Sequence, residues 1–154
     1  MKKNIVIIFA IVLFLIIGCN SNKRPSIIRM DVMFCPYLID FQGVDCEYIF
    51  EYKLSRDTSI TDKGFLDTIN QLIDKLEVIN ADSVFNVYSY NKCKLVYSND
   101  SIKILNLGLY RGTCLDGNKM KDSPNLTRSI REKIGFYNYF DSTALKYFDE
   151  YGQK

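Results

Sequence analysis

The most apolar stretch of the chain lies at its N-terminus, and it limits how much of the sequence can form a folded domain. Two lysines precede an unbroken apolar run from Ile5 to Ile17, and Gly18 and Cys19 follow it. Secretory signal peptides have a positive segment, an apolar run of this length and a small residue in this order. Thirteen helical residues span about 20 Å, less than the hydrocarbon core of about 30 Å, so a transmembrane helix is the poorer interpretation. We expect residues 1–18 to be removed, and an uncleaved signal anchor is the alternative.

The tetrapeptide that ends this leader, Ile16-Ile17-Gly18-Cys19, resembles the lipobox of bacterial lipoproteins, in which two aliphatic or small residues and a Gly or Ala precede an invariant cysteine. The resemblance covers only the leader. It implies a diacylglycerol on Cys19, cleavage before Cys19, and usually a further acyl chain on the new N-terminus. Two or three chains anchor a protein stably. An Asp directly after the cysteine resembles the inner-membrane retention signal of enteric bacteria, but this chain has Asn20 there. The outer membrane is therefore favoured where there are two membranes.

Length and charge predict that the remainder is one small, neutral domain. Residues 19–26 are expected to be the lipidated N-terminus and a short tether, and residues 27–154 have the length of a single domain. The 20 basic residues fall to 18 without the two lysines of the leader, which equals the 18 acidic ones. A nucleic-acid binder needs a basic face that neutralises phosphates. We therefore expect no nucleic-acid partner, and expect instead a membrane contact through the anchor and another envelope protein as partner.

Apolar residues alternate with polar ones in some stretches of this domain and recur with a helical period in others. Alternation predicts strands over residues 27–34, 46–54, 83–97 and 102–110, the first with Ile28, Met30, Val32 and Phe34 facing the core. Helical spacing predicts helices over residues 61–79, after Thr61 as N-cap, over 124–134, between Ser123 and Gly135, and from Asp141 or Ser142 onward. The order strand, strand, helix, strand, strand, helix, helix predicts an α+β fold. Its small antiparallel sheet has about four strands, with helices packed on one face.

Four cysteines remain after Cys19, an even number in an exported protein, where disulfides can form. A hairpin between the first two predicted strands places Cys35 opposite Cys46, within the distance that a disulfide needs. This favours Cys35–Cys46, with Cys93–Cys114 as the remaining pair, and buried thiols are the alternative. No Cys-x-x-Cys motif and no histidine occurs, so no metal site is expected.

The chain contains no histidine, which excludes Ser-His-Asp and Cys-His catalysis and most metallohydrolase sites. We therefore expect no catalytic residue and no cofactor. The paired carboxylates Asp40/Asp45 and Asp67/Asp74 are the remaining candidates for an envelope hydrolase. Because Asp67 and Asp74 lie two turns apart on a solvated helix face, a role in solubility is the simpler interpretation.

Two short glycine-containing segments do not have the pattern of a ligand-binding loop. Asp116-Gly117 predicts a turn and lacks the spacing of a calcium loop. Gly108 and Gly112 do not form a phosphate loop, because no Gly-Lys-Ser or Gly-Lys-Thr follows them.

Two surfaces are candidates for binding a partner. The hairpin connection over residues 36–45 is more apolar than a usual loop and would present Tyr37, Leu38, Ile39 and Phe41. In the third predicted strand, Tyr88 and Tyr90 fall on the outward face beside two lysines. The alternatives are that the loop side chains pack over the end of the sheet, and that the tyrosines reflect the preference of strands for aromatic residues.

These observations favour a membrane-tethered, non-catalytic module that binds or inhibits another envelope protein. Small lipoproteins of this kind are similar to immunity lipoproteins that neutralise a toxin at the membrane, but only in their size and their membrane location. A structural or assembly component of an outer-membrane complex is the alternative.

Overall fold

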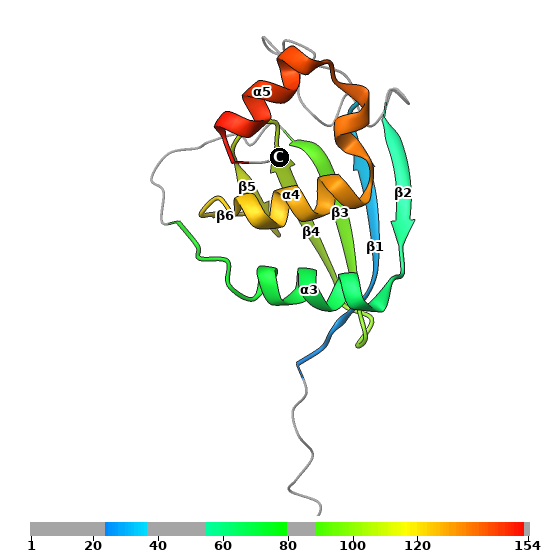
Figure 1. The fold of residues 1–154 in the computed structure, drawn as a ribbon. Helices are drawn as coiled ribbons and strands as arrows, with labels where there is room; N and C mark the ends of the chain where they lie inside the picture. Colours follow the sequence, from blue (N-terminus) through cyan, green and yellow to red (C-terminus); the bar gives the residue numbers. More distant parts are fainter. Residues whose placement is uncertain (1–23, 37–54, 80–88, 153–154) are drawn as a thin grey trace, which may run out of the picture.

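The computed structural model describes residues 24–36, 55–79 and 89–152. These residues form one sheet, with helices on one of its faces (Figure 1). The elements in chain order are β1 (Ile27–Phe34), β2 (Arg56–Ile60), α3 (Lys63–Ile73), β3 (Ser89–Tyr97), β4 (Ile102–Gly108), β5 (Thr113–Leu115), β6 (Asn118–Met120), α4 (Pro124–Lys133), the 3-10 helix η1 (Phe136–Tyr139) and α5 (Ser142–Glu150).

The sheet has six strands in the order β2-β1-β3-β4-β5-β6, and all neighbours are antiparallel. The α+β class and the antiparallel sheet are confirmed, but the prediction of about four strands is wrong. β2 is an edge strand in which only Ile60 is buried, so it has no apolar alternation. β5 and β6 have three residues each, too few for a period to be visible. The predicted strand over 46–54 lies outside the described residues.

β1 coincides with the predicted strand over 27–34, and its later apolar residues are buried. A register shift after Ile27 in the pairing with β3 changes the alternation. Ile27 is therefore buried, and Ile28 is 50% exposed. The prediction that Ile28 faces the core is wrong for this reason. β3 and β4 lie within the predicted strands 83–97 and 102–110.

α3 is shorter than its apolar pattern predicts. Asp62 caps it in place of Thr61, because the Asp62 carboxylate accepts a hydrogen bond from the backbone N–H of Phe65 at 3.0 Å. The helix ends at Ile73, and Val78 instead forms a β-bridge with Met120. The apolar residues after Ile73 therefore extend the sheet rather than the helix.

The two C-terminal helices begin where the sequence predicts, and α4 also ends there. Pro124 lies in the first turn of α4, and Gly135 ends the helix with a φ of 65°, which glycine adopts without strain. α5 begins after Asp141, whose Oδ1 accepts a hydrogen bond from the backbone N–H of Ala144 at 2.8 Å. Ser123 occupies the N-cap position of α4 without a side-chain hydrogen bond.

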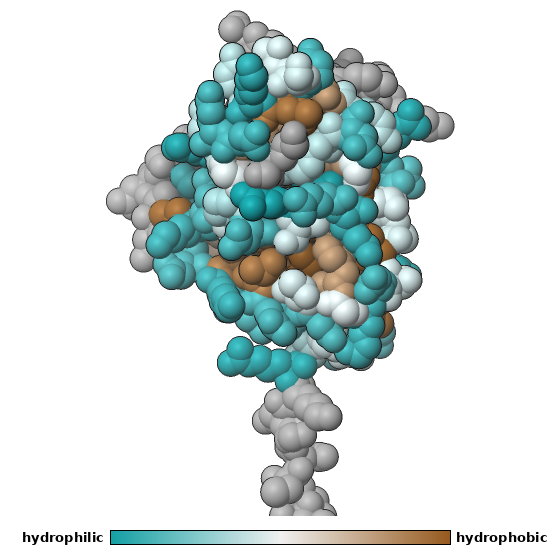
Figure 2. Space-filling model, viewed as in Figure 1, coloured by the Kyte–Doolittle hydropathy of each residue, from teal (hydrophilic) through white to brown (hydrophobic). Residues whose placement is uncertain are grey.

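The buried side chains form two clusters. The aliphatic core lies between the sheet and helices α3 and α4, and apolar side chains between these helices are visible in Figure 2. The aromatic cluster lies where β1 and β3 meet η1 and α5, and it consists of Phe34, Cys35, Tyr90, Phe136 and Phe148. The two clusters share one sheet but differ in the kind of side chain that fills them.

Candidate functional site

The strands have two ends that lie far apart, and the candidate site is at one of them. The N-terminal end contains Ile27, Tyr97 and Ile102, and the far end contains Phe34 and Gly108. At about 3.3 Å per residue, the far end of β4 is about 20 Å from its start. The site described below belongs to the far end.

Three tyrosines gather at the far end, between the β4–β5 loop and α5. The Tyr110 ring lies 5.2 Å from that of Tyr151 and 6.3 Å from that of Tyr147, and it also packs on the buried Phe148 at 5.5 Å. Tyr147 is 49% exposed and Tyr151 38% exposed. The guanidinium of Arg111 lies 5.1 Å from the Tyr151 ring centre, within cation-π distance.

A pocket of about 300 Å³ opens beside these rings, and we call it the tyrosine pocket. The β4–β5 loop, the first residues of α4 and the end of α5 form its walls. It is lined by Gly108, Tyr110, Arg111, Gly112, Thr113, Asp122, Ser123, Pro124, Thr127, Glu150 and Tyr151. Rings, one guanidinium and carboxylates therefore face the same cavity.

The β4–β5 loop is held closely by its backbone. The N–H of Gly108 donates to the carbonyl of Gly112 at 2.8 Å, and the N–H of Gly112 donates to Oδ1 of Asp122 at 2.8 Å. A Cβ at Gly108 would lie 2.0 Å from the backbone oxygen of Arg111, so only glycine fits there. Gly112 has a φ of 98°, which again requires glycine. These constraints place Tyr110 and Arg111 on the wall of the pocket.

Arg131 of α4 supports this loop from inside the protein. Its buried guanidinium donates to the carbonyls of Gly108 and Leu109 at 2.7 and 2.8 Å, and to Oδ1 of Asn91 on β3 at 2.9 Å. It also lies 4.5 Å from the centre of the Phe136 ring. Burial lowers the pKa of Arg131 to about 10, so the group stays charged at neutral pH.

The surroundings of Tyr110 keep its hydroxyl neutral. Burial raises the pKa of Tyr110, and the neighbouring Tyr147 and Tyr151 add to the rise. A neutral phenol both donates and accepts hydrogen bonds. The pocket can therefore hold a group with a flat or apolar body against the rings, and a polar tip against Arg111 or Glu150.

The structure places Tyr90 differently from the sequence prediction. Tyr90 is buried in the aromatic cluster and is not on an exposed face. The register shift between Ser89 and Asn91 in the pairing with β4 interrupts the alternation at this residue. The prediction that Tyr90 falls on the outward face is therefore wrong. Its companions in the two predicted surfaces, Tyr37, Leu38, Ile39, Phe41 and Tyr88, lie outside the described residues.

The predicted disulfide Cys93–Cys114 is also wrong, because both residues are free thiols. β4 separates their strands, so the strands lie about 9.5 Å apart, beyond the reach of a disulfide. Cys93 faces the aliphatic core, whereas Cys114 lies on the other face from its buried neighbour Leu115. Burial raises the pKa of Cys93 to about 12. Cys35 is buried, and its predicted partner Cys46 lies outside the described residues, as does Cys19.

The carboxylates that are candidates for catalysis do not converge where the structure describes them. Asp67 pairs with Lys63 one turn away, and Asp74 lies at the exposed end of the same helix, α3. Asp40 and Asp45 lie outside the described residues. Among the residues described, no three metal-ligating side chains group together. None of the described helices has the length and apolar character to cross a membrane.

The tyrosine pocket is not among the predicted sites, although two signals for it are present in the sequence. Tyr147 and Tyr151 are four residues apart in a predicted helix, and this spacing places them on one face. Tyr110 and Arg111 lie in a short loop between Gly108 and Gly112, although this segment lacks the pattern of a phosphate loop. Nothing in the spacing shows that the loop and the helix meet.

The fold and the site together define a small α+β domain with an aromatic pocket at one end of its sheet. Comparison with known proteins adds no family to this description, because no protein family, curated protein or solved structure matches the chain.

Proposed function

We propose that this protein is a lipid-anchored envelope protein whose domain binds another envelope protein at the tyrosine pocket. It acts as an inhibitor or immunity-type module, without catalysis of its own. The observation that carries the proposal is the exposed Tyr151 beside Arg111 in the wall of a pocket, with the exposed Tyr147 packed on the Tyr110 ring of the same wall.

The residue types at the pocket favour a protein partner. Tyrosine and arginine are enriched among the residues that dominate binding energy in interfaces, and tyrosine loses little conformational entropy on binding. A volume of about 300 Å³ is at the lower limit for small-molecule pockets. It suits one anchoring side chain of a partner better than a large cofactor.

The support beneath the pocket favours binding by a preformed surface. Gly108 and Gly112 hold the loop through backbone hydrogen bonds, and Arg131 holds it from below. A surface that is already ordered has a lower entropic cost on association.

The membrane location in this proposal depends on lipidation of Cys19. The tetrapeptide Ile16-Ile17-Gly18-Cys19 supports lipidation of that thiol, and Asn20 supports the outer membrane in an organism with two membranes. The test is growth with radiolabelled fatty acid, followed by membrane fractionation. We expect label and membrane association in the wild type and neither in Cys19→Ala. An unlabelled wild-type protein would contradict the anchor.

Site-specific photocrosslinking in intact cells tests the binding role. A photoreactive phenylalanine at position 147 should form an adduct with one envelope protein. The matched control is position 139, because Tyr139 is also an exposed tyrosine, at 47%, but packs on Phe34, whereas Tyr147 packs on Tyr110 in the pocket wall. Tyr151→Ala should reduce the yield at position 147 roughly tenfold, as loss of an interface hot spot does. Equal adducts from both positions would contradict the role of the pocket.

The identity of the adduct and the phenotype of a deletion separate the two roles. An immunity-type role predicts killing of the deletion strain only when a cognate toxin is present. A structural role predicts loss of envelope integrity without any toxin, and an adduct with an outer-membrane component.

A further inference from the structure

Two large aliphatic side chains are exposed at the N-terminal end of the sheet. Ile28 is 50% exposed and Ile102 51% exposed. They lie at the same level of the sheet on strands about 9.5 Å apart, because Ile102 of β4 and Arg29 of β1, next to Ile28, both pair with Val96 of the intervening β3. A single exposed isoleucine on a small domain is normal. Two at one end of a sheet form an apolar patch that can contact a membrane.

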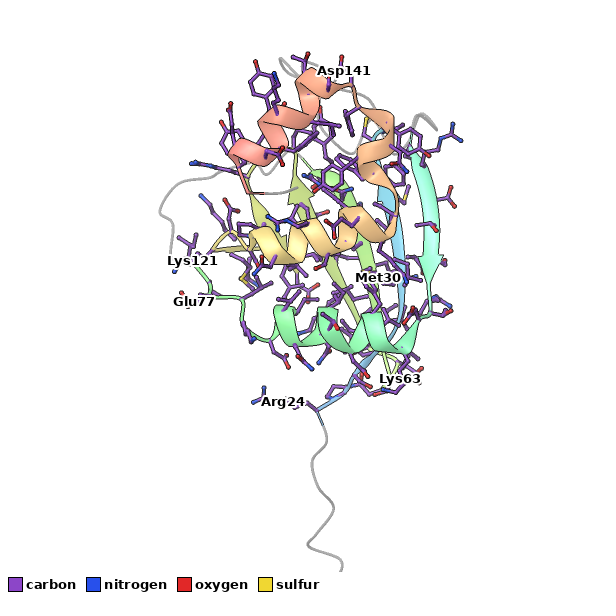
Figure 3. The ribbon with its side chains drawn as sticks, viewed as in Figure 1. Arg24, Met30, Lys63, Glu77, Lys121 and Asp141 are labelled. Atoms are coloured by element: carbon purple, nitrogen blue, oxygen red, sulfur yellow. The ribbon has the colours of Figure 1, made fainter. Side chains whose placement is uncertain are left out.

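The chain enters the fold beside this patch. The backbone N–H of Ser26 donates to the Ser98 hydroxyl at 3.2 Å, and the N–H of Ser98 donates to the Ser26 carbonyl at 2.8 Å. These bonds fix the start of the domain to the turn that joins β3 to β4. Arg24 lies at this end of the molecule and Asp141 at the opposite end (Figure 3).

The distance from Cys19 to Ser26 limits where the domain can lie. Seven residues span at most about 25 Å when fully extended. The far end of β1 lies about 20 Å beyond the start of that strand. The N-terminal end can therefore touch a bilayer while the tether is in most of its conformations. The far end can touch it only when the tether is stretched along the domain.

We propose that the N-terminal end of the sheet rests on the bilayer, with Ile28 and Ile102 in contact with the lipid interface. This inference rests on the lipid anchor of the proposed function. Arg24, at this end of the molecule, and Lys103, next to Ile102 in β4, carry positive charges that match anionic headgroups, while Asp100 in the adjacent turn opposes them. Two side chains add little to the anchoring strength of acyl chains. Their effect is on orientation, and it directs the tyrosine pocket away from the membrane.

The absence of tryptophan from the chain provides a direct test. The full-length lipidated protein carries one tryptophan, as Ile102→Trp or, for the control, Tyr139→Trp, and is reconstituted in phosphatidylethanolamine/phosphatidylglycerol vesicles. The control position contacts Phe34 at the far end, with ring centres 5.6 Å apart. We expect brominated lipids to quench the tryptophan at position 102 severalfold more than the one at position 139, and only the emission from position 102 to shift to the blue. Ile28→Trp is a second reporter, and circular dichroism shows that each variant is folded.

The outcomes separate this inference from the anchor itself. Equal quenching at both positions, or none at positions 28 and 102 in a protein that carries the lipid, overturns the orientation and leaves the anchor intact. A wild-type protein that takes up no fatty acid overturns both.

Discussion

The two ends of the sheet are built on different principles. At the N-terminal end, aliphatic side chains pack between the sheet and α3, and the strands meet in a short polar turn. At the far end, aromatic rings surround one buried arginine, and a glycine loop held by backbone hydrogen bonds follows β4. The first kind of packing is non-directional and tolerates exchange between apolar residues. The second depends on hydrogen bonds of fixed geometry, so single polar residues there should control both stability and the pocket.

The strongest test of this difference is Arg131→Met. The substitution leaves Oδ1 of Asn91 and the carbonyls of Gly108 and Leu109 without their donors. A buried acceptor without a partner costs roughly 1–3 kcal/mol, so we expect the free energy of unfolding to fall by about 3–5 kcal/mol. Urea denaturation followed by circular dichroism measures this.

The control for Arg131→Met lies two residues further along α4. Lys133 is exposed and pairs with Asp62 at 3.0 Å. Lys133→Met should lower the free energy of unfolding by less than about 1 kcal/mol. If both variants lose the same amount, the far end does not depend on the buried guanidinium.

Substitution of two glycines gives the next largest effect. Gly108→Ala puts a Cβ against the backbone of Arg111, and the resulting shift should cost about 1–3 kcal/mol. Gly64→Ala, in α3, meets only ordinary contact at 3.6 Å and should be neutral or stabilise by up to about 1 kcal/mol. Thermal unfolding measures both changes. A loss at Gly64 as large as that at Gly108 would remove the distinction between the two ends.

The same difference explains how much of the fold can be predicted from sequence. β1, β3, β4, α4 and α5 follow from apolar periodicity and from capping residues such as Pro124, Gly135 and Asp141. These signals are local, and they report which side of an element faces an apolar core.

The far end could not be predicted in this way. A register shift is set by the partner strand, so the burial of Tyr90 depends on pairing that the local sequence does not contain. The same holds for the exposure of Ile28 at the N-terminal end. Arg131 lies in the last turn of α4, where the helix dipole favours a cation even on the surface. Nothing in the local sequence shows that this arginine is buried. The tyrosine pocket joins a loop to a helix more than thirty residues later. Short or polar strands such as β2 are not predicted for a simpler reason, because they bury too little apolar surface to give an apolar period.

The smallest expected effect concerns the exposed ion pair between α3 and α4, and it sharpens the contrast with Arg131. The pKa of Asp62 is lowered, first by the hydrogen bond from the Phe65 N–H and then by Lys133. Because the folded pKa lies below the unfolded value, the charged carboxylate stabilises the fold above about pH 4, and this is lost as pH falls through the folded pKa. Asp62→Asn keeps an oxygen for the cap but removes the charge. It should lower the melting temperature at pH 7 by a small amount, and the difference from wild type should disappear near pH 2.

The Asp62→Asn, Lys133→Met double variant separates the charge interaction from the cap. If the attraction between the two side chains is the cause, the double variant should melt no lower at pH 7 than the lower-melting single variant. Additive losses would instead mean that Lys133 acts through its packing on the Phe65 ring, at 5.2 Å from its centre. In either case the loss should be far below that of Arg131→Met. Two cations two residues apart on one helix would then differ in effect because only one is buried and holds the far end together.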